Sequence, residues 1–133
     1  MSRKRTVILI SGRGSNMTAL IAAAGDPDYP VEIVGVISDR ADAAGLNIAK
    51  ARGIATQVVA RADHPSREAH DGAIDAALSA FGAEIVALAG YMRLLAPGFV
   101  EKWQGRMINI HPALLPAFKG LDTHARALHA GMR

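Results

Sequence analysis

Short apolar runs alternate with longer segments of helical periodicity along this chain. The first run, Val7–Ser11, is continuously apolar up to its terminal serine, which is typical of a strand buried on both faces of a sheet. The next segment, Ser15–Ala24, is predicted to form a helix that ends at Gly25-Asp26-Pro27. Its apolar residues share one helical stripe, formed by Met17, Leu20, Ile21 and Ala24.

The same alternation predicts the rest of the fold. Further strands are expected at Val31–Ser38, Thr56–Val59, Glu84–Ala89 and Met107–Ile110. A helix is expected at Ala43–Arg52, with Ala44, Ile48 and Ala51 facing inward. A second helix is expected from a cap at Ser66 to about Ala80, and its inward residues are Ala73, Ile74, Ala77 and Leu78. A last helix should begin at Asp122 or Thr123. Repeated strand–helix units predict an α/β class, a Rossmann-like and mostly parallel sheet with helices on both faces. Ligands of such sheets bind beyond the carboxyl ends of the strands.

Composition supports one globular domain over residues 1–133. Of the 133 residues, 50% are hydrophobic and 20% are charged, so the chain can bury a core. Aromatic residues are scarce, and the core is therefore expected to consist of Ala, Val, Ile and Leu. Cysteine is absent, which excludes disulfides and thiolate metal sites. No apolar run suits a signal peptide or a membrane span, so we expect a soluble, cytoplasmic protein.

The charge distribution argues against nucleic acid as a partner. The formal net charge is only +3 although the pI is about 9.7, and beyond the first five residues the basic side chains are dispersed. Nucleic-acid binding would require a basic stripe, ideally with aromatic residues between the charges. A mildly positive protein is equally suited to small anionic substrates.

A glycine-containing loop, Ser11–Asn16, joins the first predicted strand to the first helix. Gly12 and Gly14 allow several backbone N–H groups to point into one space, and Ser15 could cap the helix or bond a phosphate oxygen. The loop therefore predicts an anion site. A dinucleotide fingerprint would need a third glycine where Met17 stands, although Asp39 is placed to bind a ribose hydroxyl. A tight turn that binds nothing is the other interpretation.

The last predicted strand ends in Asn109-Ile110-His111-Pro112. Ile108 and Ile110 should point to one face, and Asn109 and His111 to the other. An amide and an imidazole side by side could stabilise the oxyanion of an acyl transfer, and the imidazole could also move a proton. Alternatively, both side chains satisfy buried backbone groups where the strand meets the loop.

Other polar residues have simpler interpretations. Arg67 shares a helix face with Asp71 and Asp75, which predicts solvent-exposed ion pairs. His70 is expected to be a packed, neutral histidine. No metal site is predicted, because Asp122, His124 and His129 lack paired-ligand spacing.

Five ordered segments together resemble the folate-dependent phosphoribosylglycinamide formyltransferases: 10–16 (ISGRGSN), 66–68 (SRE), 88–95 (LAGYMRLL), 108–116 (INIHPALLP) and 120–124 (GLDTH). The resemblance implies formyl transfer from 10-formyltetrahydrofolate, a co-substrate, to the amine of 5-phosphoribosylglycinamide, with no metal or other cofactor. It implies that Asn109 and His111 are catalytic. It implies a phosphate site at Gly12, Arg13, Gly14, Ser15, Asn16, Met17 and Thr18, and a folate site at Arg67, Met92, Arg93, Leu94, Leu95 and Asn109.

Related formyl enzymes fit less well. Formyltetrahydrofolate hydrolases carry His-His-Ser where this chain has His111-Pro112-Ala113, and methionyl-tRNA formyltransferases have a different segment in place of Lys119–Asp122. Family members continue past the equivalent of Arg133 with a catalytic aspartate, so we expect the sequence to be C-terminally incomplete. A non-catalytic nucleotide-binding module and the hydrolase remain alternative functions. The resemblance is compatible with a homodimer.

Overall fold

A computed structural model describes residues 3–12, 14–91 and 95–110. Its centre is a five-stranded sheet in the order β3-β2-β1-β4-β5, in which every neighbouring pair is parallel. The strands are β1 (Lys4–Ile10), β2 (Val31–Ser38), β3 (Thr56–Val58), β4 (Ile85–Leu88) and β5 (Met107–Asn109). The predicted α/β class with a parallel sheet is confirmed.

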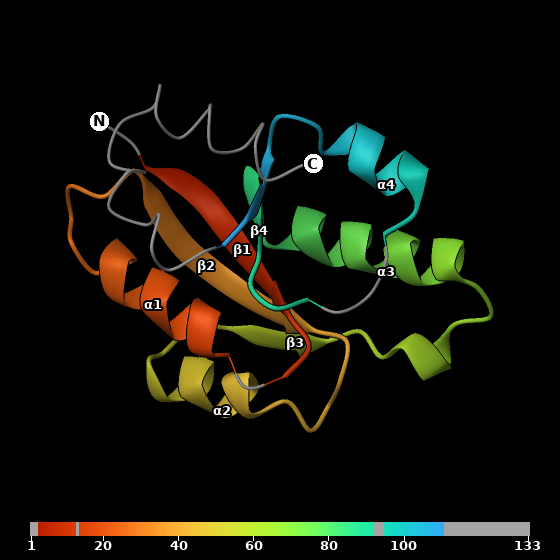
Figure 1. Ribbon diagram of the computed structural model, residues 1–133, viewed down its shortest axis with the longest axis horizontal. Coiled ribbons are helices and arrows are strands. Elements are labelled where there is room, and N and C mark those ends of the chain that lie inside the picture. The colour runs from red at the N-terminus through yellow and green to blue at the C-terminus, as the bar shows by residue number, and fades with distance from the viewer. Residues whose placement is uncertain (1–2, 13, 92–94, 111–133) are drawn as a thin grey trace.

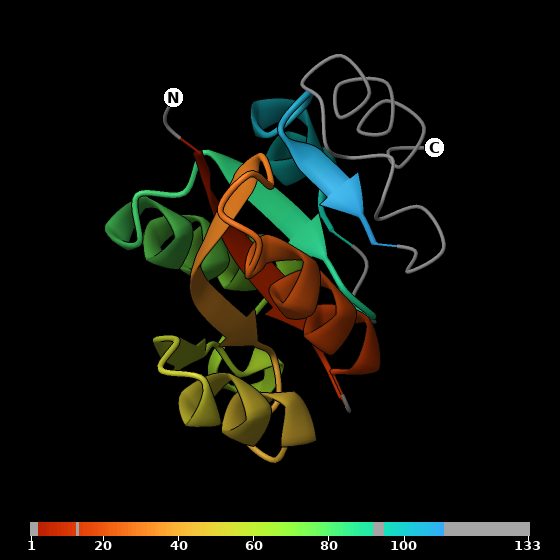
Figure 2. The ribbon, with the colours of Figure 1, turned by 90° about the vertical axis from the view of Figure 1, so that its left-hand side faces the viewer.

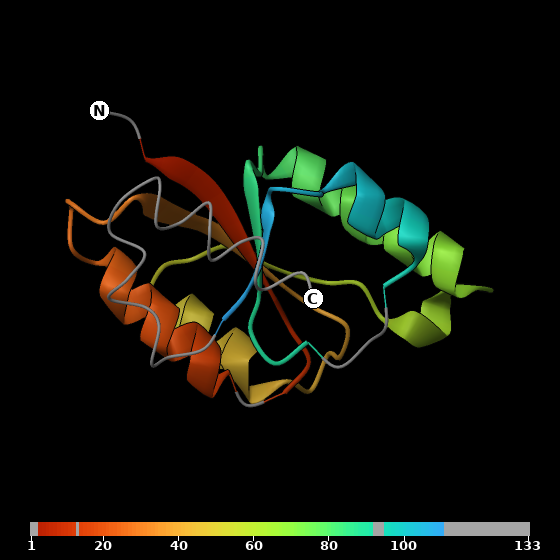
Figure 3. The ribbon, with the colours of Figure 1, turned by 45° about the horizontal axis from the view of Figure 1, so that its top comes forward.

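Helices cover both faces of this sheet. The pair α1 (Ser15–Ala24) and α2 (Ala44–Ala51) lies on one side, and the pair α3 (Arg67–Ala80) and α4 (Pro97–Lys102) on the other, as Figures 1 and 3 show. A short 3₁₀ helix, η1 (Arg61–Asp63), precedes α3. Viewed from the side, the sheet is visibly twisted between these layers (Figure 2). The three layers leave the ends of the strands as the places where a ligand can approach.

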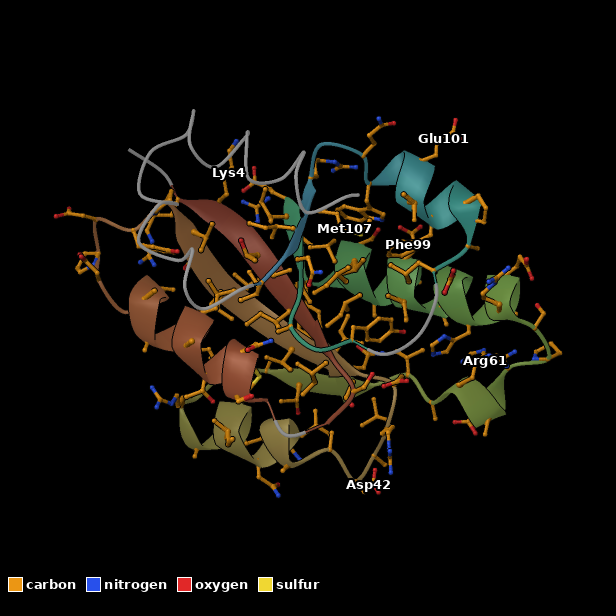
Figure 4. All side chains as sticks on the ribbon, in the orientation of Figure 1. Lys4, Asp42, Arg61, Phe99, Glu101 and Met107 are labelled. Atoms are coloured by element: carbon orange, nitrogen blue, oxygen red, sulfur yellow. The ribbon has the colours of Figure 1, made fainter. Side chains whose placement is uncertain are left out.

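Alternation along β1 divides the core into two clusters. Ile8 and Ile10 pack with α1 and α2, whereas Val7 and Leu9 pack with α3 and α4. All four side chains are fully buried, as predicted for a strand covered on both faces. In Figure 4, Phe99 of α4 and Met107 of β5 lie on the α3 side of the sheet, where both belong to the second cluster.

Several predicted elements are confirmed closely. The buried residues of α1 are the predicted stripe, Met17, Leu20, Ile21 and Ala24. Ser66 caps α3, because its hydroxyl oxygen accepts the N–H of Ala69 at 3.0 Å. Ile74, Ala77 and Leu78 are buried beneath that helix, and Ala73 is partly buried.

The inward face of one helix was predicted partly wrongly, and another helix was not predicted. The buried residues of α2 are Gly45, Leu46 and Ala49, while Ala44 and Ala51 are exposed, because Gly45 packs against the loop that follows β1. Ile48, the third residue predicted to face inward, is partly buried and packs against the core. Helix α4 was not predicted at all. It spans only six residues, too few for the helical repeat to be recognised from the sequence. The helix predicted from Asp122 lies outside the described residues.

The basic residues at the start of the chain have structural partners. The guanidinium of Arg3 donates to the carbonyls of Ala24 and Val31. The N–H of Arg5 donates to Glu84 at 2.9 Å, and this hydrogen bond, with the nearby cations, holds the pKa of Glu84 below its usual value. These side chains therefore fasten strand ends opposite the edge where ligands are expected.

Candidate functional site

The glycine loop after β1 and Asn109 at the end of β5 both lie at the carboxyl edge of the sheet. Register pairs Leu9 with Leu88, and Leu88 with Asn109, so β4 separates β1 from β5. The next strand in the chain, β2, pairs with one edge of β1, whereas β4 pairs with the other edge of β1. Such a reversal of strand order opens a crevice at the carboxyl ends. The glycine loop after β1 and Asn109 lie at this edge, on strands about 10 Å apart, since adjacent strands are spaced by ~4.8 Å.

Two facing glycines shape the loop after β1. Gly14 precedes α1 with a φ of +79°, a conformation that glycine adopts without strain. A Cβ atom on Gly14 would lie 2.8 Å from the Cα of Gly45. The N–H of Gly45 also donates to the carbonyl of Gly12 at 3.2 Å. The first turn of α2 thus supports the loop directly from below.

The first turn of α1 presents backbone rather than side chains. Ser15 is the first helical residue and does not cap the helix, so that prediction was wrong; the capping position is occupied by Gly14, which has no side chain. Met17 is fully buried, with its side chain in the core. The hydroxyl of Thr18 donates to the carbonyl of Gly14 at 2.9 Å. The arrangement suits an anion at the positive end of a ten-residue helix.

The other residues predicted for this anion site are partly described. The side chain of Ser15 is exposed and that of Asn16 is half-buried, so both can meet a ligand at the mouth of the loop. Gly12 is exposed and leaves open space where a Cβ would stand. Arg13 lies outside the described residues.

Asn109 ends β5 with an exposed side chain, while Ile108 and Ile110 are buried on the α1 side. The predicted alternation is confirmed for these three residues. Asn109 therefore faces the same side as Met107, the side covered by α3 and α4. His111 lies outside the described residues.

The predicted folate residues that the structure describes lie on this same side. Leu95 packs against the core cluster beneath α3 and α4, and Arg67 begins α3 with a half-buried side chain. Gly90, which opens the segment after β4, has a φ of +73°. Met92, Arg93 and Leu94 lie outside the described residues. The face shared by Arg67, Leu95 and Asn109 is consistent with one binding region.

The solvent-exposed ion pairs predicted for Arg67 were wrong. Asp71 is 4% exposed, and its Oδ2 accepts the N–H of Ala96 at 2.6 Å. Asp75 accepts from Lys102 Nζ at 2.6 Å and from Trp103 Nε1 at 2.9 Å. Burial alone would raise the pKa of Asp75, but these donors and the nearby cations lower it. Both carboxylates attach α3 to the α4 region.

Sequence reasoning missed the role of Asp71 although a signal was present. Asp71 lies three residues before Ile74 and seven before Leu78, both fully buried, so it falls on the core-facing stripe of α3. A carboxylate at such a position needs an internal hydrogen-bond donor. The i,i+4 spacing to Arg67 suggested a partner at the surface instead.

His70 is the packed histidine that the sequence predicted. It is 1% exposed, and its Nε2 lies 2.6 Å from the carbonyl of Val59, so that nitrogen carries the hydrogen and donates. Across the described ranges, no cluster of three or more His, Cys, Asp or Glu side chains could hold a metal ion. Within the same ranges, no helix is long and apolar enough to cross a membrane.

Comparison with known proteins adds independent findings. The formyl transferase family profile matches residues 4–133. The chain is 43% identical over 125 residues to the phosphoribosylglycinamide formyltransferase of Escherichia coli, covering 94% of this chain and 59% of that protein. It is 48% identical over 130 residues to the trifunctional purine biosynthetic protein adenosine-3 of Bos taurus, covering 98% of this chain and 13% of that protein.

A solved structure agrees with these relatives. The phosphoribosylglycinamide formyltransferase of Brucella melitensis is 59% identical, with a TM-score of 0.79, and the match covers 98% of this chain and 68% of that one. The chain thus spans roughly three fifths to two thirds of its bacterial relatives.

Proposed function

The chain belongs to the formyl transferase family, and on that premise we propose that it transfers the formyl group of 10-formyltetrahydrofolate to the amine of 5-phosphoribosylglycinamide. One observation supports the proposal beyond family membership. The glycine loop after β1 and the exposed side-chain amide of Asn109 lie at the same edge of the sheet, two strands apart. That spacing suits a substrate with an anion at one end and a reacting group at the other.

The phosphate of the ribosyl substrate is proposed to bind at the first turn of α1. Gly12 and Gly14 allow close approach of backbone N–H groups, and the helix dipole favours negative charge there. Ser15 and Asn16 add hydrogen-bonding side chains at the mouth of the loop. Met17 contributes its N–H alone, because its side chain is in the core. Thr18 acts through its hydrogen bond to Gly14.

The folate is proposed to bind on the side of the sheet covered by α3 and α4. Leu95, with Met92, Arg93 and Leu94, would receive the bicyclic ring. Arg67 would meet the acidic tail, since its cationic side chain begins α3 on that side. The folate is consumed in the reaction as a co-substrate.

The reaction proposed is an acyl transfer from one nitrogen to another. The substrate amine attacks the formyl carbon, a new C–N bond forms, and negative charge develops on the formyl oxygen. Asn109 donates an N–H to that oxygen, and protonated His111 stabilises it as well. Collapse breaks the bond to the folate nitrogen, which takes up the proton that the attacking amine loses, with His111 as the carrier.

Steady-state assays with both substrates test this proposal. Turnover that requires both the formyl folate and phosphoribosylglycinamide supports it, and His111→Ala should lower kcat by orders of magnitude. Formate release without an amine acceptor would indicate the hydrolase instead. Saturation by NAD with no binding of folate would indicate a nucleotide-binding module. A cytoplasmic location and a homodimer also stay predictions from the sequence, to be tested by cell fractionation and light scattering.

A further inference from the structure

We propose that Asp71 is a positioning residue for folate binding. It would fix Leu95 and Ala96, the end of the segment predicted to receive the folate ring, against the helix that carries Arg67. This inference rests on the proposed function and adds to it a residue to which neither the sequence pattern nor the family resemblance assigned a role in the site.

The first argument is a contact at the end of that segment. Ala96, the capping position of α4, is 6% exposed, and its N–H donates to Oδ2 of Asp71 at 2.6 Å. Hydrogen bonds to an ionised carboxylate at this length are among the stronger ones in proteins. At the other end, the N–H of Ala89 donates to the carbonyl of Leu9 at 3.0 Å. The connection is thus tied to the sheet where it begins and to α3 where it ends.

The second argument is the electrostatic environment of Asp71. Its Oδ1 is buried and has no hydrogen-bond partner among the described residues. Nδ1 of His70 lies 4.0 Å from this oxygen. At that distance the ring nitrogen makes no hydrogen bond to the carboxylate. A buried carboxylate with half of its acceptors unused destabilises a fold, so stability alone does not explain this residue.

The third argument is the spacing between the two helices. A groove of about 280 Å³ lies between α3 and α4, lined in part by Asp71, Asp75, Ala96 and Phe99. A Cβ on Gly72 or on Gly98, which also line it, would meet nothing within 4 Å. The two helices are therefore not closely packed along this groove, although Phe99 and Trp103 are buried in the cluster beneath α3. Across the groove the carboxylates link them, with Asp71 at the start of α4 and Asp75 at its end.

The consequence concerns Arg67, one helical turn before Asp71. Residues four apart lie on the same face of a helix, so the carboxylate that holds Ala96 also fixes how far Leu95 lies from the Arg67 end of α3. A ligand that contacts both would bind tightly only when that separation is kept.

The decisive variant is Asp71→Leu in the full chain. Leucine removes the acceptor, fills the site with a side chain of similar size and leaves the N–H of Ala96 without its partner. We expect the KM for 10-formyltetrahydrofolate to rise about ten- to a hundred-fold, the loss typical of a hydrogen bond to a charged group. The KM for phosphoribosylglycinamide should stay within about two-fold, which separates a loss of positioning from a loss of the fold.

Two matched variants and one structural readout complete the test. Asp71→Asn keeps an acceptor for Ala96 and should restore folate KM. Asp75→Ala removes the other attachment of α4, one turn along the same helix, and should leave folate KM near the wild-type value. Hydrogen exchange at the Ala96 amide should be slow in the wild type and fast in Asp71→Leu.

Equal folate KM in Asp71→Leu and Asp75→Ala, or unchanged exchange at Ala96, would overturn the positioning role. A wild-type protein that neither binds folate nor transfers formyl groups would instead refute the proposed function. The exchange measurement would still show whether Asp71 holds the Ala96 amide.

Discussion

Replacing Gly45 by alanine should weaken phosphate binding, because Gly45 in α2 packs against the loop after β1. The added Cβ would lie 2.6 Å from Cδ1 of Ile10 and 3.2 Å from the Cα of Gly14. Ile10 is fully buried and has little room to move, so the backbone of the loop must shift. Overpacking of this kind costs about 1–3 kcal/mol, and alanine returns about 1 kcal/mol of helix propensity in α2. The net loss of stability is therefore between roughly 0 and 2 kcal/mol.

The matched control is Gly72→Ala. Gly72 lies inside α3, and a Cβ there meets nothing within 4 Å, so the same gain in helix propensity should raise stability by about 1 kcal/mol. The two variants should therefore differ by about 1–3 kcal/mol, or several degrees in Tm for a domain of this size.

The assay is a comparison of KM values for the two substrates. Gly45→Ala should raise the KM for phosphoribosylglycinamide, because the N–H groups of the loop lose their alignment, and should leave the KM for the formyl folate unchanged. Gly72→Ala should change neither. If Gly45→Ala melts like Gly72→Ala and keeps the wild-type phosphate affinity, the contact between α2 and the loop does not support the site.

Three further outcomes are expected. Gly14→Ala should abolish phosphate-dependent binding, measured by titration with the ribosyl substrate, because its φ of +79° and a Cβ only 2.8 Å from the Cα of Gly45 both oppose the change. Ser66→Ala should lower the unfolding free energy by about 1 kcal/mol in urea titrations, through loss of the α3 cap. The pKa of Asp75 is lowered in the folded protein, so its contribution is present above the unfolded value of ~3.9 and is lost as pH falls through the lower folded value. The Tm difference between the wild type and Asp75→Asn should accordingly be constant near neutrality and shrink in acid below about pH 4.

The sequence allowed the sheet to be predicted because its strands are short apolar runs between polar loops. Val7–Ile10 is buried on both faces, and a short apolar run of this kind between polar loops is typical of a strand in a parallel sheet. The edge that carries the glycine loop and Asn109 followed from the parallel strand order alone.

Errors arose where tertiary contacts overrule local pattern. The inward face of α2 is decided by the approach of Gly45 to Gly14, which no two-turn helix can reveal by itself. Asp71 has an opposite charge four residues before it, and its burial depends on Ala96, a residue of another segment. Contacts between residues so far apart in the sequence leave no periodic pattern from which they could be predicted.

The central place of β1 also bears on how the protein is made. Thr6 pairs with Ile33 on one side and with Ile85 on the other, so the first pairing closes a short stretch of chain and the second a much longer one. Loop closure is slower for distant partners, and a ribosome delivers the near partner first. We expect β1 and β2, with the glycine loop between β1 and α1, to assemble during synthesis, while the edge of β1 that later pairs with β4 stays unpaired. Until β4 has been synthesised, the unpaired backbone groups at this edge of β1 can pair with strands of other chains. Pairing with β4 therefore protects the nascent protein from aggregation.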